Sequence, residues 1–280
     1  VGLDGTGIKQ IIMTYMNLKP TKLLSERWRS SCIEPGMLLL VHSNILRTMQ
    51  EFQKEDIPLT VNDILDSFIE AVGPEGTLLF PLFNFDFSCG KSFDMKTSKS
   101  NMGALTEAAR LRTDSIRTGH PVYSFAVLGR LKEKFRGLNN LTAYAAGSPF
   151  EMVHSMRGYV AVLDLTDQAS MTFYHHVEEM EKIPYRYQKK FWGSYTDLEG
   201  HKEIREYFIN VRDLDAGVCT HVEPTGDELW SKGLYKGFRV GEESGLRVIY
   251  SEDAYQAVSA IIRSGRAEGM LYRIEKPTEK

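Results

Sequence analysis

The chain has 280 residues, of which 42% are hydrophobic and 25% are charged, and its formal net charge is −3. This much apolar material is enough for a sizeable core and excludes disorder over most of the length. The near-neutral balance of charge excludes a broad basic field, so we expect no nucleic-acid partner and no binding to a membrane surface. No apolar run reaches the roughly 18 residues that span a bilayer.

The N-terminal residues Val1–Lys9 contain three glycines and lack the apolar stretch that a signal peptide needs. The cysteines are far apart and form no CxxC pair; they are Cys32, Cys89 and Cys219. An odd number of isolated cysteines argues against a disulfide framework and against a structural zinc site. These features predict a cytoplasmic protein without a metal cofactor.

Continuous apolar runs of strand length recur along the chain at wide spacing. The clearest lie at 37–41, 77–80, 124–128 and 159–163, and weaker ones follow at 207–211 and 247–250. Continuous rather than alternating runs are typical of strands that are buried on both faces of an α/β sheet.

Helical patterns lie between these runs. Thr60 is predicted to cap a helix that ends at Gly73, and residues 102–112 form a second helix rich in alanine and leucine. A third helix is predicted to begin at Ser251 and to stop at Gly265.

The alternation of strands and helices predicts one layered α/β domain over residues 1–280, in which helices flank a central, mostly buried β-sheet. No internal repeat and no long linker divides the chain. The stretch from about 182 to 245 is the most polar and irregular part. We expect this stretch to form a lid or a subdomain over a site.

Several common catalytic motifs are missing from the sequence. It contains no complete P-loop, no GxGxxG, no GxSxG and no HExxH. The pair His175-His176 does not replace the last of these, because adjacent histidines on a helix point about 100° apart and chelate one ion poorly. We therefore expect no metal site.

The first polar segment of interest is Val41-His42-Ser43-Asn44, at the end of the first apolar run. Small polar residues there place backbone N–H groups at a strand-to-helix turn, which is a ready site for a phosphate or another anion. The alternative interpretation is an ordinary turn that caps a helix.

The second segment is 117–124, in which His120 precedes a proline and is therefore held in extended backbone. Gly119 in the same segment permits close approach of a ligand or of another part of the chain. The alternative is a tight loop that leads into a strand.

The third segment is 172–179. If it is helical, His175 and Glu178 lie three residues apart on one face. A carboxylate so placed can orient the imidazole and raise its basicity, so that it accepts a proton from an ammonium or a hydroxyl group. The alternative is a solvated face of histidine and glutamate.

Taken together, these segments resemble the aminoglycoside 3-N-acetyltransferase family, antibiotic N-acetyltransferases that are distinct from the GNAT fold. The matching pieces stand in family order: 40–43; 72–78 with Pro81; Phe93-Asp94 with Thr97-Ser98; 102–107 with Arg110; Arg117, His120-Pro121, Ser124 and Gly129; Gly147-Ser148-Pro149; and Thr172, His175 and Glu178. The resemblance covers residues from about 20 to 180, and more weakly to about 265.

The resemblance implies an N-acyltransferase that uses an acyl-CoA, in the first place acetyl-CoA, as co-substrate. Its acceptor would be an amine of an aminoglycoside or another amino sugar, a small molecule. His175 matches the family's proposed catalytic base, and Glu178 matches its partner carboxylate. The other matching or adjacent positions imply cofactor binding by Ser43, Asn44, Ile45, His120, Ser124, Phe125 and Ala126, and acceptor binding by Asp94, Glu107 and Arg186.

The chain departs from the family pattern at three places. The loop His42-Ser43-Asn44-Ile45-Leu46-Arg47 contains no glycine where the family has a glycine-rich turn, Leu82 replaces a threonine, and Asp164 replaces the glycine before the catalytic helix. The segment 184–190 is basic and aromatic, so it would repel a polycationic drug and would suit an acceptor that carries phosphate. A nucleotide-linked amino sugar of polysaccharide biosynthesis is therefore an alternative acceptor.

Two further functions stay open at this stage. A protein that kept the fold but lost transfer would be a non-catalytic module that binds CoA or a sugar, and a hydrolase of CoA thioesters would use the same histidine on water. The oligomeric state is open too, with a homodimer as one alternative.

Overall fold

The computed structural model describes residues 19–275, so the expectation for Val1–Lys9 lies outside the described residues. The helices are α2 (Pro20–Ser30), α3 (Leu46–Lys54), α4 (Val61–Val72), α5 (Ala104–Leu111), α6 (Pro149–Ser155), α7 (Asp167–Ser170), α8 (Phe173–Met180), α9 (Glu223–Ser231), α10 (Ser251–Arg263) and α11 (Ala267–Met270), with short 3-10 turns η1 (Phe87–Cys89) and η2 (Lys132–Phe135). The strands are β1 (Leu38–Ser43), β2 (Thr77–Pro81), β3 (Phe93–Asp94), β4 (Ile116–Arg117), β5 (Phe125–Gly129), β6 (Tyr159–Leu163), β7 (Arg186–Thr196), β8 (Lys202–Arg212), β9 (Val218–Thr220), β10 (Lys236–Gly237), β11 (Leu246–Tyr250) and β12 (Tyr272–Ile274).

A seven-stranded sheet in the order β10-β11-β6-β1-β2-β5-β4 forms the centre of the molecule. The inner strands β6, β1 and β2 run parallel, with Leu40 opposite both Leu79 and Val160, whereas β5 and β11 run antiparallel beside them. The four clear apolar runs of the sequence form β1, β2, β5 and β6, and the weaker run at 247–250 lies in β11. These predictions are confirmed.

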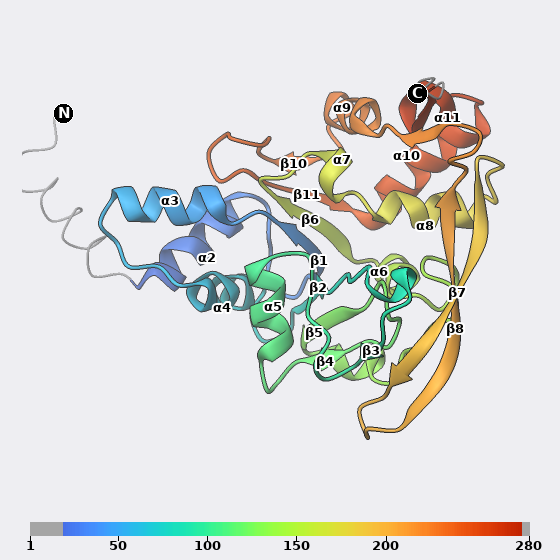
Figure 1. The fold of residues 1–280 in the computed structure, drawn as a ribbon. Helices are drawn as coiled ribbons and strands as arrows, with labels where there is room; N and C mark the ends of the chain where they lie inside the picture. The colour runs from blue at the N-terminus through green and yellow to red at the C-terminus, as the bar shows by residue number, and fades with distance from the viewer. Residues whose placement is uncertain (1–18, 276–280) are drawn as a thin grey trace, which may run out of the picture.

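Helices cover both faces of this sheet (Figure 1). Leu39 and Val41 of β1 pack on the side of α2, α4 and α5, while Leu38 and Leu40 pack on the side of α6, α8 and α10. Every one of these four side chains is buried, because a central strand contacts a helical layer on each face. The predicted α/β class with a buried, helix-flanked sheet is therefore correct.

The helix ends follow the sequence signals closely. Thr60 accepts a hydrogen bond from the Asp63 backbone N–H and the Asp63 carboxylate accepts one in return, which closes the capping box that opens α4. The same helix packs on α2, where the Trp28 ring stacks on Phe68 at 5.0 Å between centroids. None of the described helices combines the length and the apolar character needed to cross a membrane.

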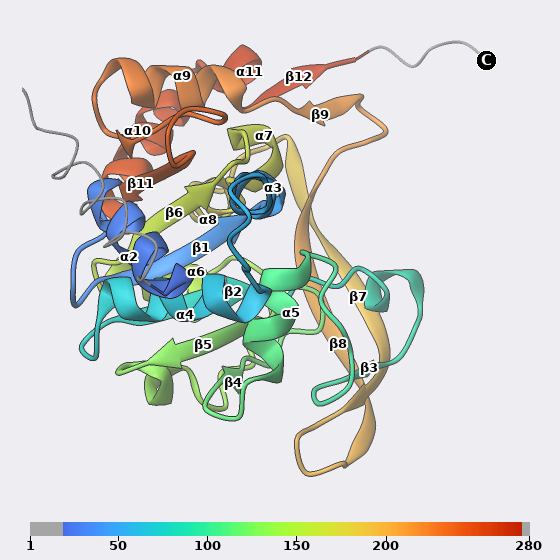
Figure 2. The same cartoon turned by 90° about the vertical axis from the view of Figure 1, so that its left-hand side faces the viewer.

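The polar stretch at 182–245 contains several separate elements, and its expected role as a lid or subdomain stays a prediction. Its first part is a long antiparallel hairpin, β7–β8, which pairs with β3 in a separate three-stranded sheet. The hairpin runs beside the helical layer that contains α8 (Figures 1 and 2). The later part contains β9 and α9, and β10 then joins the edge of the central sheet. The weak run at 207–211 lies in β8 and thus belongs to the hairpin.

Candidate active site

Helix α8 brings the predicted catalytic pair into contact. Phe173, Tyr174 and Val177 are buried and fix one side of the helix in the core. His175 and Glu178 then stand one turn apart, and the distance from His175 Nδ1 to Glu178 Oε2 is 2.7 Å. The pairing expected from the spacing is present.

The Glu178 carboxylate is almost completely enclosed, with 1% of its side chain exposed. Three groups surround it: His175, the hydroxyl of Tyr185, which donates to Oε1 at 2.9 Å, and Arg186, whose Nε lies 2.9 Å from Oε2. Burial by itself would raise the pKa of this carboxyl, but Arg186 and the hydrogen bonds from His175 and Tyr185 outweigh burial and hold the pKa below its usual value. Glu178 is therefore an anion at neutral pH.

An ionised Glu178 can only accept hydrogen bonds, so His175 donates to it through Nδ1–H and leaves Nε2 as the basic nitrogen. Burial, followed by the charge of Arg186, lowers the pKa of His175, and the contact with Glu178 opposes this shift without cancelling it. Glu178 does raise the pKa of His175, as expected, but burial and Arg186 lower it by more. The net result is a neutral imidazole, ready to accept a proton at neutral pH.

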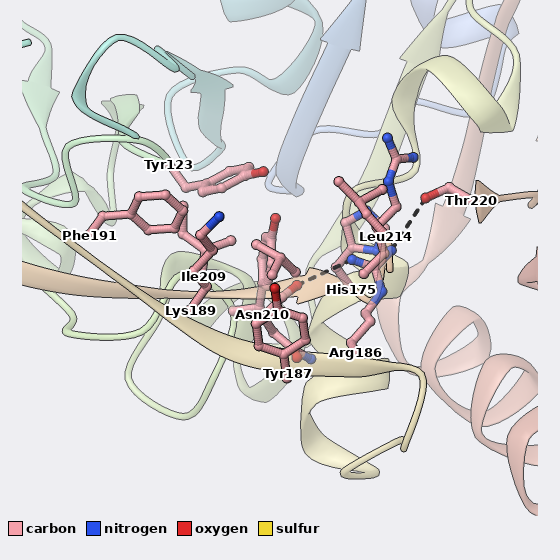
Figure 3. Close-up of a pocket in the computed structure, with 13 residues that line it drawn as sticks. Tyr123, His175, Arg186, Tyr187, Lys189, Phe191, Ile209, Asn210, Leu214 and Thr220 are labelled. Atoms are coloured by element: carbon pink, nitrogen blue, oxygen red, sulfur yellow. Dashed lines mark hydrogen bonds between the residues drawn. The ribbon is translucent and has the colours of Figure 1, made fainter. Parts of the chain in front are cut away.

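His175 opens onto a pocket of about 310 Å³ between α8 and the β7–β8 hairpin. Figure 3 shows Tyr123 and Phe191 on one side of this pocket, and Arg186 and Thr220 on the other. The complete lining is Tyr123, Tyr144, His175, Arg186, Tyr187, Lys189, Phe191, Ile209, Asn210, Val211, Arg212, Leu214 and Thr220. Arg186 is fixed in this wall because Nη1 donates to the Asn210 carbonyl at 3.2 Å and Nη2 donates to the Thr220 hydroxyl at 3.5 Å.

Tyr144 forms the floor beside the candidate base, with its ring centroid 5.4 Å from that of His175. The neighbouring His176 lies only 2.6 Å from the Tyr144 carbonyl through Nδ1 and pins this loop to α8. Burial raises the pKa of Tyr144 well above its usual value, so its hydroxyl stays protonated. Sequence reasoning missed Tyr144 and Tyr123, and the contact between His176 and the loop carbonyl has no sequence signal.

The predicted cofactor turn, Ser43-Asn44-Ile45, lies at the carboxyl end of β1, where the chain enters α3. Two amides of the turn have partners: Asn44 N–H donates to the Leu163 carbonyl at 2.8 Å, and Leu46 N–H donates to the Asn44 side chain at 3.0 Å. The buried Ser43 hydroxyl oxygen has no hydrogen-bond partner among residues 19–275. Because this oxygen is buried, a ligand at the edge of the sheet would reach it only if neighbouring groups moved.

The other predicted cofactor residues are enclosed in the core: His120, Ser124, Phe125 and Ala126 each have an exposed fraction of 0%. Ser124 accepts from Arg117 Nε at 3.2 Å, and His120 Nδ1 accepts from the backbone N–H groups of Val122 and Tyr123. A direct side-chain contact with a cofactor would need their neighbours to move. Their assignment to the cofactor stays a prediction; His120 and Ser124 form hydrogen bonds in the loop that carries Tyr123, and Phe125 and Ala126 belong to β5.

Two of the departures from the family pattern contact each other. Arg47 Nε lies 2.8 Å from Asp164 Oδ2, and Asp164 adopts a φ of 46°, in the left-handed region that favours glycine. Asp164 also accepts from the Gly241 N–H at 3.0 Å. The ion pair thus ties the first turn of α3 to the end of β6, and Asp164 also binds the loop before β11.

Asp94 and Glu107, the predicted acceptor carboxylates, do not line the pocket. Asp94 closes a turn by accepting from the N–H groups of Lys96 and Thr97 at 2.7 and 2.9 Å. Glu107 pairs with Arg110, which donates to both of its oxygens. The structure does not bring these two carboxylates together with His175, whereas Arg186, the third predicted acceptor residue, does stand beside it.

Comparison with known proteins places this geometry in a family context. Residues 40–263 match the family model described as aminoglycoside 3-N-acetyltransferase. One relative, the SPbeta prophage-derived aminoglycoside N(3')-acetyltransferase-like protein YokD of Bacillus subtilis, is 23% identical over 231 residues, which are 70% of this chain and 82% of that protein.

Solved structures share the fold. AAC-IIIb in a binary complex with CoASH has a TM-score of 0.71 and 18% identity, with 93% of this chain and 99% of that chain covered. An AAC(3)-IVa variant in complex with apramycin has a TM-score of 0.67 and 21% identity, with 89% of this chain and 93% of that chain covered. The family match spans most of the sequence and includes both α8 and the β7–β8 hairpin. The chain therefore belongs to the aminoglycoside 3-N-acetyltransferase family, a family of enzymes.

Proposed function

We propose that the protein is an acyl-CoA-dependent N-acyltransferase that transfers an acetyl group directly to the amine of an amino sugar. The observation that carries the proposal is the neutral His175, held through Nδ1 by an ionised Glu178 and opening onto a pocket. A base held in one tautomer with its second nitrogen free is the arrangement that amine deprotonation requires.

In the proposed reaction, His175 Nε2 takes a proton from the acceptor amine as the nitrogen lone pair attacks the thioester carbonyl. The C–N bond forms, the C–S bond breaks, and the CoA thiolate leaves and takes up a proton. Glu178 keeps the ring oriented and stabilises the imidazolium that forms, because its negative charge lies 2.7 Å from Nδ1. A positioned general base of this kind contributes roughly 10²–10⁴-fold.

The donor belongs on the side of the Ser43-Asn44-Ile45 turn. The fold shared with a CoASH-bound relative supports a CoA thioester as co-substrate. The unpartnered Ser43 hydroxyl and the start of α3 lie at the carboxyl edge of the parallel strands, the usual ligand position in α/β sheets. No side chain of this turn lines the His175 pocket, so donor and acceptor reach the base from different sides.

A thiol-release assay tests the proposal. Purified protein is given acetyl-CoA with and without amino sugars, and the acetylated product is identified by mass spectrometry. We expect thiol release that depends on the amine and matches the amount of product. Release without any amine would instead show a thioester hydrolase, and CoA binding without release would show a binding module.

A further inference from the structure

The pocket in front of His175 is positively charged. Its lining contains Arg186, Lys189 and Arg212 but no aspartate or glutamate. The nearby Glu178 is enclosed and already surrounded by His175, Tyr185 and Arg186. Since His175 is neutral, the charge that faces the pocket comes from Lys189 and Arg212.

Neither of these two cations is paired inside the described part of the chain. Within residues 19–275, no carboxylate oxygen lies within 4.0 Å of Lys189 or Arg212. The adjacent Lys190 behaves differently: it lies on the other face of β7 and pairs with Glu206 at 3.0 Å. The register places Arg212, like Arg186, on the same face of the ladder as Lys190, so the two unpaired cations reach the pocket lining from opposite faces of the hairpin.

The strand register adds a second observation. Arg186 and Arg212 stand directly opposite each other in the β7–β8 ladder. Like charges in this position destabilise a strand pair. Arg186 is compensated by Glu178, whereas Arg212 lines the pocket and interacts with a carboxylate, that of Glu275, only at a distance beyond 4.0 Å. An anion bound there would remove this repulsion.

A polycationic acceptor lacks a matching group in this pocket. The carboxylates predicted to bind one, Asp94 and Glu107, are occupied elsewhere by a turn and by Arg110. The remaining walls suit an uncharged ring, since Tyr187, Phe191 and Leu214 provide apolar surface.

Resting on the proposed transferase function, we propose that the acceptor is an amine that also carries an anionic group, a phosphate or a carboxylate. Lys189 and Arg212 hold the anion, while the amino group of the same molecule meets His175. The acceptor class thus differs from the polycationic drug named with one solved relative.

The test compares glucosamine, glucosamine 6-phosphate, glucosaminuronic acid and kanamycin as acceptors with saturating acetyl-CoA. We expect the highest kcat/KM with one of the two anionic amines, and their ranking distinguishes phosphate from carboxylate. Lys189→Gln and Arg212→Gln should each raise KM for that amine by roughly tenfold or more, as for a lost charged hydrogen bond. The matched control Lys190→Gln should change neither KM nor kcat/KM for that amine. Faster turnover of kanamycin than of both anionic amines would overturn the proposal.

Two further measurements separate this proposal from its alternatives. Repeating the assay with S-acetylpantetheine, which lacks the nucleotide phosphates of CoA, should leave the effects of Lys189→Gln and Arg212→Gln unchanged. Effects that vanish with this donor would assign both cations to the donor and refute the proposal. Calorimetric titration compares the binding of glucosamine 6-phosphate and glucosaminuronic acid with that of glucosamine, so it tests the anionic ligand class without any turnover. Tighter binding of the anionic amines without thiol release would reject the transferase function but keep the anion site.

Discussion

Two buried carboxylates in this molecule have nearly the same neighbours. Glu178 is surrounded by His175, Tyr185 and Arg186, with distances of 2.7–2.9 Å. Asp167 is surrounded by Arg247 at 2.8 Å and by the hydroxyls of Tyr174 and Tyr235 at 2.6 and 2.8 Å. Both therefore combine a carboxylate with an arginine and with tyrosine, one hydroxyl at Glu178 and two at Asp167.

The two networks differ in whether one of the groups that contact the carboxylate also lines a pocket. Around Asp167 each partner is itself buried, and none of these residues lines a described pocket. Around Glu178, the imidazole has one nitrogen bound to the carboxylate and opens onto the pocket. Both networks are buried and ionic, but only the one around Glu178 holds a titratable group at a cavity, as the proposed base requires.

The largest expected loss of activity is for a substitution in the network around Glu178. His175→Ala should lower kcat/KM by at least ~10²-fold, because it removes the base. CoA affinity, measured by calorimetry, should stay within about threefold, because the residue is not on the donor side. A folded variant that keeps more than about a tenth of the activity would exclude His175 as the base.

A pair of variants tests whether the network around Glu178 acts in the reaction while the network around Asp167 only stabilises the fold. Glu178→Gln and Asp167→Asn each leave a buried arginine without its carboxylate, which costs about 3–5 kcal/mol of unfolding free energy. Chemical denaturation should show this loss in both variants. Only Glu178→Gln should also lower kcat, since Asp167 does not touch the base. Equal losses of kcat in the two folded variants would contradict the distinction.

A pH profile sharpens the role of Arg186. In the proposed mechanism the neutral form of His175 is the active one, so activity should fall as the pH drops through the pKa of His175, which burial holds below its usual value. The charge of Arg186 contributes to this lowering, after burial. Arg186→Gln should therefore move the acid limb of kcat to higher pH. An unchanged limb with reduced kcat would indicate that Arg186 only supports the wall.

The smallest effect is expected for Tyr185→Phe. The substitution removes one neutral donor to Glu178 and leaves the ion pair with Arg186 intact. The unfolding free energy should fall by about 0.5–1.5 kcal/mol. Activity at neutral pH should change by less than about tenfold, which steady-state kinetics will check. A loss as large as that of His175→Ala would mean that the hydroxyl acts in the reaction itself.

The sequence predicted what depends on local periodicity. The continuous runs identified the inner strands, and the spacing of three residues placed His175 and Glu178 on one face of α8 because an α-helix brings such positions together. The capping signal at Thr60 was correct for the same reason.

The parts that depend on distant contacts were not predictable. Arg212 reaches the pocket only through the register of β8 on β7, and Tyr144 only through its carbonyl contact with His176. Arg186 was expected to bind the acceptor, yet its ion pair with Glu178 could not be read from a segment assumed to be a polar lid. Burial, which lowers the pKa of His175, is likewise a property of the whole fold.

The long β7–β8 hairpin also bears on how such an enzyme diversifies. Its backbone is held by its own ladder, so exposed side chains that line the pocket, such as Lys189 and Tyr187, are exchangeable without disturbing the strands. The base and its carboxylate reside on a different element, anchored in the core. In the proposed enzyme, the side chains that select the acceptor and the residues that perform the reaction thus lie largely on different elements. Mutations in the hairpin could change the preferred acceptor while His175 and Glu178 keep their positions.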